Sequence, residues 1–238
     1  MTKHFKPMTT ILKVGLLLIF SLIIPTIAGV YLSIKEINDP VMINIVNGCA
    51  MLFGFFLLQL FIKKSPFRIK EVGFQKGSIG IWIYPLLLIE LIPFISGIQR
   101  EISIEYIVTL FFFMGCVGFF EESLFRGLIF QYLKTFNVKI AIWGSAVLFG
   151  IGHAANLLSG ESMVMTVSQI VFAFLFGFVA AEIVALTKSL QWVIVWHVMH
   201  NVIDQVTTDT HHMPILFIQC LILLMIALFM WRRMNIRT

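Results

Sequence analysis

The chain has 238 residues, of which 59% are hydrophobic and 12% are charged, and its formal net charge is +5. Soluble domains carry about 25% charged residues, so this composition excludes an ordinary soluble protein and indicates repeated membrane spans. The basic residues are dispersed among the loops instead of clustering in one tail or on one face, which argues against a nucleic-acid partner.

Apolar runs long enough to cross a bilayer follow one another along the chain. About 20 apolar residues span the hydrocarbon core, and charged or turn-rich breaks separate runs of that length here. The eight predicted spans are Val14 to Ile34, Val41 to Ile62, Ile79 to Ile98, Tyr106 to Leu133, Ile140 to Leu158, Val164 to Thr187, Leu190 to Val206 and Ile215 to Trp231. Backbone groups in lipid must be hydrogen-bonded internally, so each span is expected to be a helix. We predict an all-α, polytopic bundle in the lipid bilayer, with about eight transmembrane helices forming one integral membrane domain over residues 1–238.

The positions of lysine and arginine predict the orientation of this bundle, because cytoplasmic loops carry an excess of both. Counting loops alternately from a cytoplasmic N-terminus leaves only Lys35 and Arg100 outside. The basic residues then placed inside are Lys3, Lys6, Lys13, Lys63, Lys64, Arg68, Lys70, Lys76, Lys134, Lys139, Lys188, Arg232, Arg233 and Arg237. Both termini are therefore expected on the cytoplasmic side.

The fourth predicted span contains two carboxylates and a guanidinium within an otherwise apolar run. Charge at membrane depth is costly, so it suggests a functional site. On a helix Glu122 and Arg126 lie one turn apart on the same face, whereas Glu121 is turned about 100° away. Arg126 can therefore hold Glu122 while Glu121 serves another purpose. The alternative is a structural ion pair between helices, which would not need the second carboxylate.

The fifth predicted span ends with His153, preceded by Gly150 and Gly152. Glycine lets a neighbouring helix approach closely, which suits an imidazole that reaches into a packed interior. The alternative interpretation of His153 is a buried histidine that serves only as a hydrogen-bond donor within the bundle.

The seventh predicted span contains His197, His200 and Asn201. His197 and Asn201 are four residues apart and share a helix face, whereas His200 is turned about 100° from Asn201. An imidazole and an amide can both stabilise charge in a dry site, although the same pair could also hold helices together by hydrogen bonds.

Helix geometry predicts that these polar groups meet at one depth. At 1.5 Å per residue, they lie about 14–21 Å from the basic residues at the inner ends of their spans, within a core about 30 Å thick. We therefore expect Glu121, Glu122, Arg126, His153, His197 and Asn201 to form one site. Other polar residues are interpreted as structural: Glu90 and Glu182 as single carboxylates without an evident partner, and His211 and His212 as a solvated turn.

The three motifs resemble those of the CPBP family, which includes the type II CAAX endopeptidases and bacteriocin-processing membrane proteins. The family's patterns are Glu-Glu-x-x-x-Arg, Phe-x-x-x-His and His-x-x-x-Asn, each on a separate span. They correspond here to Glu121 to Arg126, Phe149 to His153, and His197 to Asn201. The resemblance covers about Phe119 to Ile203, so the motif-bearing core is expected at about residues 106–206. His200 is an additional histidine that the pattern does not require.

The resemblance implies an intramembrane endopeptidase of a bacterial cell membrane, with a peptide or membrane-anchored protein as substrate. Glu121 and His153 would activate water, Glu122 and Arg126 would organise the site, and His197 and Asn201 would stabilise the oxyanion. The two glutamates could exchange roles. No cofactor is required by this scheme, although zinc bound by Glu121, His153 and His197 is an alternative. Neither the oligomeric state nor a prenyl group on the substrate follows from the sequence.

Two other functions are compatible with a small polytopic membrane protein. A non-catalytic binding protein, such as a bacteriocin-immunity protein, would not need every motif position filled, yet all are filled here. A proton-coupled transporter could use Glu, His and Arg as a relay, but transporters often show internal repeats, and none is evident.

Overall fold

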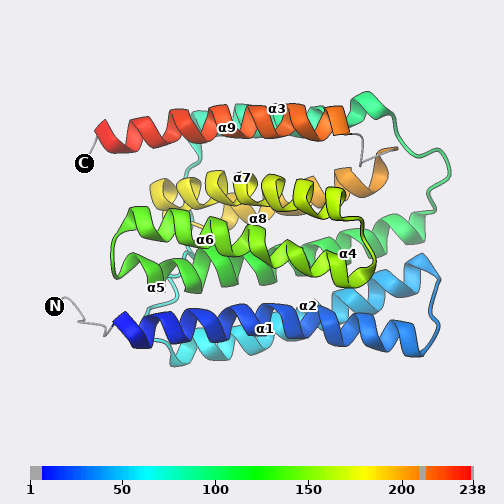
Figure 1. Ribbon diagram of the computed structural model, residues 1–238, viewed down its shortest axis with the longest axis horizontal. Coiled ribbons are helices and arrows are strands. Elements are labelled where there is room, and N and C mark those ends of the chain that lie inside the picture. Colours follow the sequence, from blue (N-terminus) through cyan, green and yellow to red (C-terminus); the bar gives the residue numbers. More distant parts are fainter. Residues whose placement is uncertain (1–6, 209–212, 237–238) are drawn as a thin grey trace.

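The computed structural model describes residues 7–208 and 213–236, and this part of the chain is helical (Figure 1). The pair His211 and His212 lies outside the described residues. The helices are α1 (Pro7–Ile34), α2 (Pro40–Lys64), α3 (Ile83–Leu91), α4 (Ile104–Glu122), α5 (Phe130–Lys134), α6 (Val138–Gly152), α7 (Met163–Thr187), α8 (Gln191–Val206) and α9 (Met213–Ile236). The prediction of an all-α membrane bundle is confirmed.

Six helices in the described ranges are long and apolar enough to cross a membrane. They are Pro7–Ile34, Pro40–Lys64, Ile104–Lys134, Val138–Ala155, Met163–Thr187 and Met213–Met234. The third and seventh predicted spans are shorter helices. The third is interrupted because Pro93 cannot continue the ladder of hydrogen bonds in α3 and Gly97 has a φ of 97°. The seventh, α8, has only 16 residues.

The ends of the long helices follow local sequence signals. Asp39, Ser103, Asn137 and Ser162 each precede a helix, and each side chain accepts a hydrogen bond from a backbone N–H in the first turn. Such caps satisfy donors that have no partner within the helix. The breaks between the apolar runs therefore define the boundaries of α2, α4, α6 and α7.

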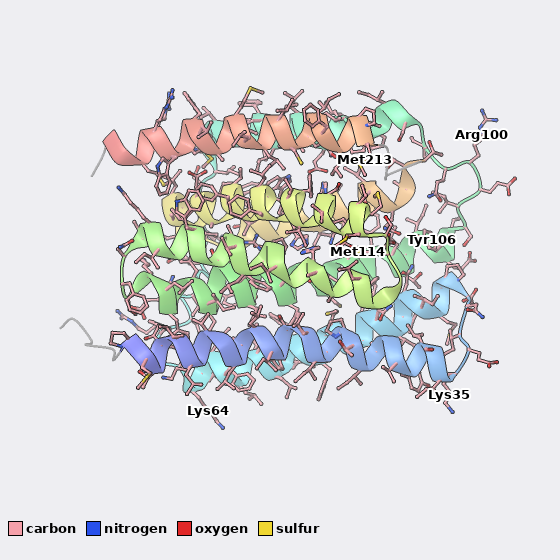
Figure 2. All side chains as sticks on the ribbon, viewed as in Figure 1. Lys35, Lys64, Arg100, Tyr106, Met114 and Met213 are labelled. Atoms are coloured by element: carbon pink, nitrogen blue, oxygen red, sulfur yellow. The ribbon has the colours of Figure 1, made fainter. Side chains whose placement is uncertain are left out.

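The helices form a layered bundle in which α3 and α9 lie along one edge and α1 and α2 along the opposite edge (Figure 1). Helices α4 to α8 lie between them, so the three motifs occupy the interior. Pro7 and Ile236 lie at the same end of the bundle. Lys64 is at that end, whereas Lys35 and Arg100 are at the other (Figure 2). The cytoplasmic position of the end with the termini remains a prediction from the distribution of basic residues.

Candidate active site

The carboxylates of the fourth predicted span lie where the helix changes its hydrogen-bonding pattern. Glu122 is the last residue of α4, and a π-helical turn from Ser123 to Ile129 connects it to α5. Every residue of that turn is buried. Wider turns of this kind occur frequently at functional sites, because they re-aim side chains without ending the helix. Sequence periodicity did not indicate this turn.

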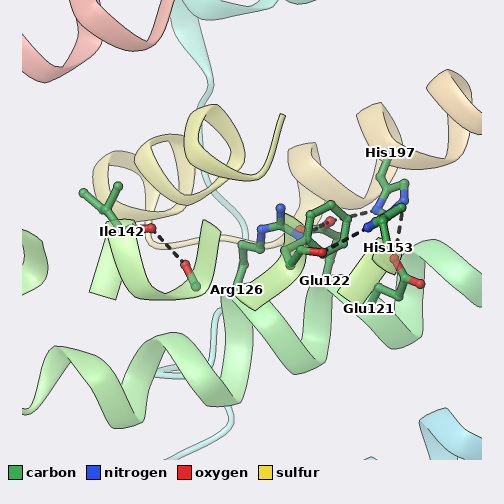
Figure 3. Close-up of polar contacts among 8 residues, drawn as sticks. Glu121, Glu122, Arg126, Ile142, His153 and His197 are labelled. Carbon is green, nitrogen blue, oxygen red and sulfur yellow. Dashed lines mark hydrogen bonds and ion pairs between the residues drawn. The ribbon is translucent and has the colours of Figure 1, made fainter. Parts of the chain in front are cut away.

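Glu122 binds two other polar residues through one oxygen atom. Arg126 Nη1 donates to Glu122 Oε1 at 2.9 Å, and His197 Nδ1 lies 2.7 Å from the same oxygen (Figure 3). The side chains of Glu122 and Arg126 are both 0% exposed. The predicted pairing across one helical turn is therefore present, and it joins α4 to α8 through His197.

Glu121 faces the other nitrogen of the same imidazole. Its Oε2 lies 3.8 Å from His197 Nε2, and its side chain is 25% exposed, whereas Glu122 is inaccessible. A carboxylate paired with a guanidinium accepts hydrogen bonds, so Glu122 fixes the tautomer of His197 with the proton on Nδ1. In the neutral ring, Nε2 is then the lone-pair nitrogen and is directed toward Glu121. The accessible carboxylate and the free imidazole nitrogen are thus neighbours.

The Arg126 guanidinium is held between an aromatic ring and a glycine. Its Cζ lies 3.9 Å from the centre of the Phe149 ring, a cation–π contact made in a buried position. A Cβ added to Gly177 of α7 would lie 2.7 Å from Arg126 Nη2. Gly177 therefore leaves the space that Arg126 occupies. Sequence reasoning missed this residue, because it belongs to a helix without a family motif.

His153 follows α6 directly, where the chain tightens into a 3₁₀ turn from His153 to Ser159. Its Nδ1 lies 3.0 Å from the carbonyl oxygen of Phe149, which can only accept, so Nδ1 carries the proton. The Phe149 ring packs against both imidazoles, at 5.0 Å from His153 and 5.9 Å from His197 between ring centres. The two histidines of the predicted site thus both contact one aromatic ring.

A cavity of about 180 Å³ brings together the imidazoles and the amide. His153, His197 and Asn201 all line it, as the predicted common depth requires. Its other lining residues are Phe149, Met165, Gln169, Phe172, Ala173, Phe176, His200, Asp204, Leu216 and Gln219. Met165, Asp204 and Leu216 lie near the helix ends opposite the chain termini, so the cavity extends from the site toward that end.

The two glycines before His153 behave differently. A Cβ on Gly150 would lie 3.0 Å from the Ile170 carbonyl oxygen, so this glycine permits the predicted close approach of α6 to α7. A Cβ on Gly152 would meet nothing within 4 Å. The close packing next to His153 therefore depends on Gly150 alone of the two.

Glu90 does have partners, contrary to its interpretation as a single carboxylate. Trp196 Nε1 donates to Glu90 Oε1 at 2.8 Å, and His200 Nδ1 lies 3.2 Å from each carboxylate oxygen. Glu90 is on α3 and its partners are on α8, more than 100 residues later, so local spacing could not reveal the contact. The only sequence signal was the spacing of Trp196 and His200, which places both on one face of a helix. Glu182, in contrast, is buried with neither carboxylate oxygen hydrogen-bonded to the described residues.

The residues suggested for zinc do not form a complete ligand set. Within residues 7–208 and 213–236, no group of three or more His, Cys, Asp or Glu side chains is placed to hold a metal ion. His153 and His197 both use Nδ1 for protein contacts, which leaves Nε2 as the nitrogen of each ring that could hold a metal ion. A catalytic zinc site needs about three protein ligands around one point. Zinc bound by Glu121, His153 and His197 therefore stays an alternative to the metal-free scheme.

The comparisons with known proteins agree with the motifs. Residues 103–203 match the family model described as type II CAAX prenyl endopeptidase Rce1-like. Comparisons with curated proteins and with solved structures gave no match. The matched segment begins at the cap of α4 and ends within α8, so it contains Glu121, Glu122, Arg126, His153, His197 and Asn201. Residues 103–203 of this chain are therefore similar to the Rce1-like family, in agreement with the resemblance of the motifs to the CPBP family.

Proposed function

We propose that the protein hydrolyses a peptide bond of a peptide or membrane-anchored protein, with Glu121 as the base. One observation carries the proposal: Glu122 binds both Arg126 and His197, while the accessible Glu121 faces the same imidazole. A purely structural ion pair would end at Glu122 and Arg126. Here the pair orients a histidine against a second carboxylate, which is an arrangement suited to proton transfer.

The chemistry requires a base for water and donors for the developing oxyanion. Glu121, assisted by His153, takes a proton from water as its oxygen bonds to the scissile carbonyl carbon. The carbonyl oxygen gains negative charge, and Asn201 stabilises it through its side-chain N–H groups. His197 donates to it through Nε2 when that nitrogen is protonated, because Nδ1–H is bound to Glu122. Two carboxylates flank His197, and they compensate the positive charge that the ring carries when both its nitrogens are protonated. The carbon–nitrogen bond then breaks, and the departing amine requires a proton.

Asn201→Ala tests the role of the amide. We expect turnover to fall about 10²-fold while substrate affinity changes little, because the contact with the oxyanion strengthens only in the transition state. Single-turnover cleavage of a co-purified membrane-anchored reporter measures the rate, and retention of the reporter by the detergent-solubilised protein measures affinity. Weaker retention at an unchanged rate would contradict an oxyanion role.

The proposed reaction proceeds through side chains without a metal ion, because Glu121, His153, His197 and Asn201 can supply the base and the oxyanion donors that it needs. We expect the purified protein to retain most of its activity after prolonged treatment with a strong chelator. Activity that disappears with removal of stoichiometric zinc and returns with its restoration would contradict this proposal. It would make Glu121, His153 and His197 the first residues to examine as ligands.

Two rival functions have less support at this site. A bacteriocin-immunity or other binding protein would not need a histidine fixed in one tautomer between two carboxylates. A transporter relay would need a continuous polar path, whereas Glu122 and Arg126 end in a fully buried pair.

A further inference from the structure

A second carboxylate and imidazole pair lies beside the predicted site. Glu90 of α3 is buried, and both of its oxygens lie 3.2 Å from His200 Nδ1. The His200 ring stacks on Phe172 of α7, with ring centres 4.9 Å apart and an angle of 21° between planes. The carboxylate and the aromatic ring together hold the imidazole in one orientation. The nitrogen that does not face Glu90 is Nε2.

The Glu90 pair repeats the arrangement of the Glu122 pair. In both, a buried carboxylate from another helix approaches Nδ1 of a histidine on α8, at 2.7 Å from His197 and 3.2 Å from His200. Both histidines line the same cavity of about 180 Å³, together with His153 and Asn201. The second histidine is therefore oriented toward the same space as the first.

We propose that His200 is a catalytic acid of this site, oriented by Glu90, and that it protonates the amine that leaves when the peptide bond breaks. The inference rests on the proposed function and adds a residue that the family pattern does not contain. The Nε2–H bond of His200 breaks as the nitrogen–proton bond of the amine forms, and the carbon–nitrogen bond breaks at the same time. Glu121 then releases to solvent the proton that it took from water, and His200 takes up a proton from the solvent of the cavity that it lines, so that the protons balance.

Helix docking alone would not require His200 in this position. Trp196 Nε1 already binds Glu90 at 2.8 Å, and the Trp196 ring stacks on Phe176 at 3.9 Å between ring centres. Trp196 thus links α3 to α8 and α7 without lining the cavity. Helix docking and acid catalysis can therefore be separated by changing Trp196 and His200 individually.

The test compares an anilide with an ester that has the same acyl group. The acyl segment is taken from a peptide that the wild-type, full-length protein cleaves, selected from a membrane-anchored peptide library. Its para-nitroanilide needs a proton on the departing nitrogen, whereas the phenolate of its para-nitrophenyl ester leaves without one. His200→Asn keeps an N–H near Glu90 but removes Nε2. We expect anilide cleavage to fall about 10²-fold and ester cleavage by less than about 3-fold.

Matched variants make each outcome decisive. Trp196→Phe removes a hydrogen bond to Glu90 and should lower thermal stability while leaving the anilide-to-ester rate ratio unchanged. Glu121→Gln should slow both substrates, so full cleavage by that variant refutes Glu121 as the base and not the role of His200, whereas wild-type protein that cleaves neither substrate refutes the proposed function. Equal loss for both substrates, or no loss, in His200→Asn overturns the proposal. If His200→Asn does not accumulate, Glu90→Gln is tested in its place and must lower the anilide-to-ester rate ratio by about 10-fold. An unchanged ratio in Glu90→Gln overturns the proposed role of His200.

Discussion

Glu121→Gln is expected to reduce cleavage at least about 10³-fold without preventing accumulation of the protein in the membrane. Gln has the size and hydrogen-bonding capacity of Glu but cannot accept a proton from water, and general base catalysis contributes about 10²–10⁴-fold. The side chain is partly exposed and contacts His197 only at 3.8 Å, so its replacement leaves the buried Glu122 and Arg126 pair intact. Cleavage of a co-expressed reporter, normalised to the amount of protein, measures the effect.

Glu101→Gln provides a matched control, because Glu101 is an exposed carboxylate that follows Arg100, which lies at the end of the bundle opposite the termini (Figure 2). It should cleave at the wild-type rate. Full cleavage by Glu121→Gln together with none by Glu122→Gln would reverse the roles of the two carboxylates. Full cleavage by both would end the endopeptidase interpretation and favour the membrane binding protein.

Arg126→Met is expected to lower the free energy of unfolding by about 3–5 kcal/mol, because it leaves the Glu122 carboxylate buried without its cation. Both side chains are 0% exposed, so water cannot compensate the charge. Phe149 also loses the guanidinium that packs on its ring at 3.9 Å. Unfolding of the purified protein in a denaturing detergent measures the change.

The double variant Glu122→Gln with Arg126→Met separates charge from packing. Removing both partners of a buried ion pair is often nearly neutral, whereas removing one is not. We therefore expect the double variant to recover most of the stability that Arg126→Met loses. A double variant as unstable as Arg126→Met would mean that lost packing, and not the uncompensated carboxylate, causes the loss.

The sequence by itself determined the all-helical membrane class of the protein and predicted the main groups of the candidate site. Long apolar runs cannot be hydrated and must satisfy their backbone groups internally, so helices in a membrane were the expected outcome. The spacing of Glu122 and Arg126 was sufficient to predict their ion pair, because residues four apart meet on any helix. Counting residues from the basic helix ends also predicted that His153, His197 and Asn201 share one level, and all three line one cavity.

Only the tertiary structure decided which partner each buried group has. The contact between Glu90 and His200 joins positions 110 residues apart, and the periodicity of a local stretch of sequence cannot indicate a contact at that separation. The π-helical turn after Glu122 and the space that Gly177 leaves for Arg126 likewise depend on how α4 packs against α8 and how the turn itself packs against α6 and α7. Periodicity describes which residues share a face, whereas the position of a neighbouring helix determines what that face touches.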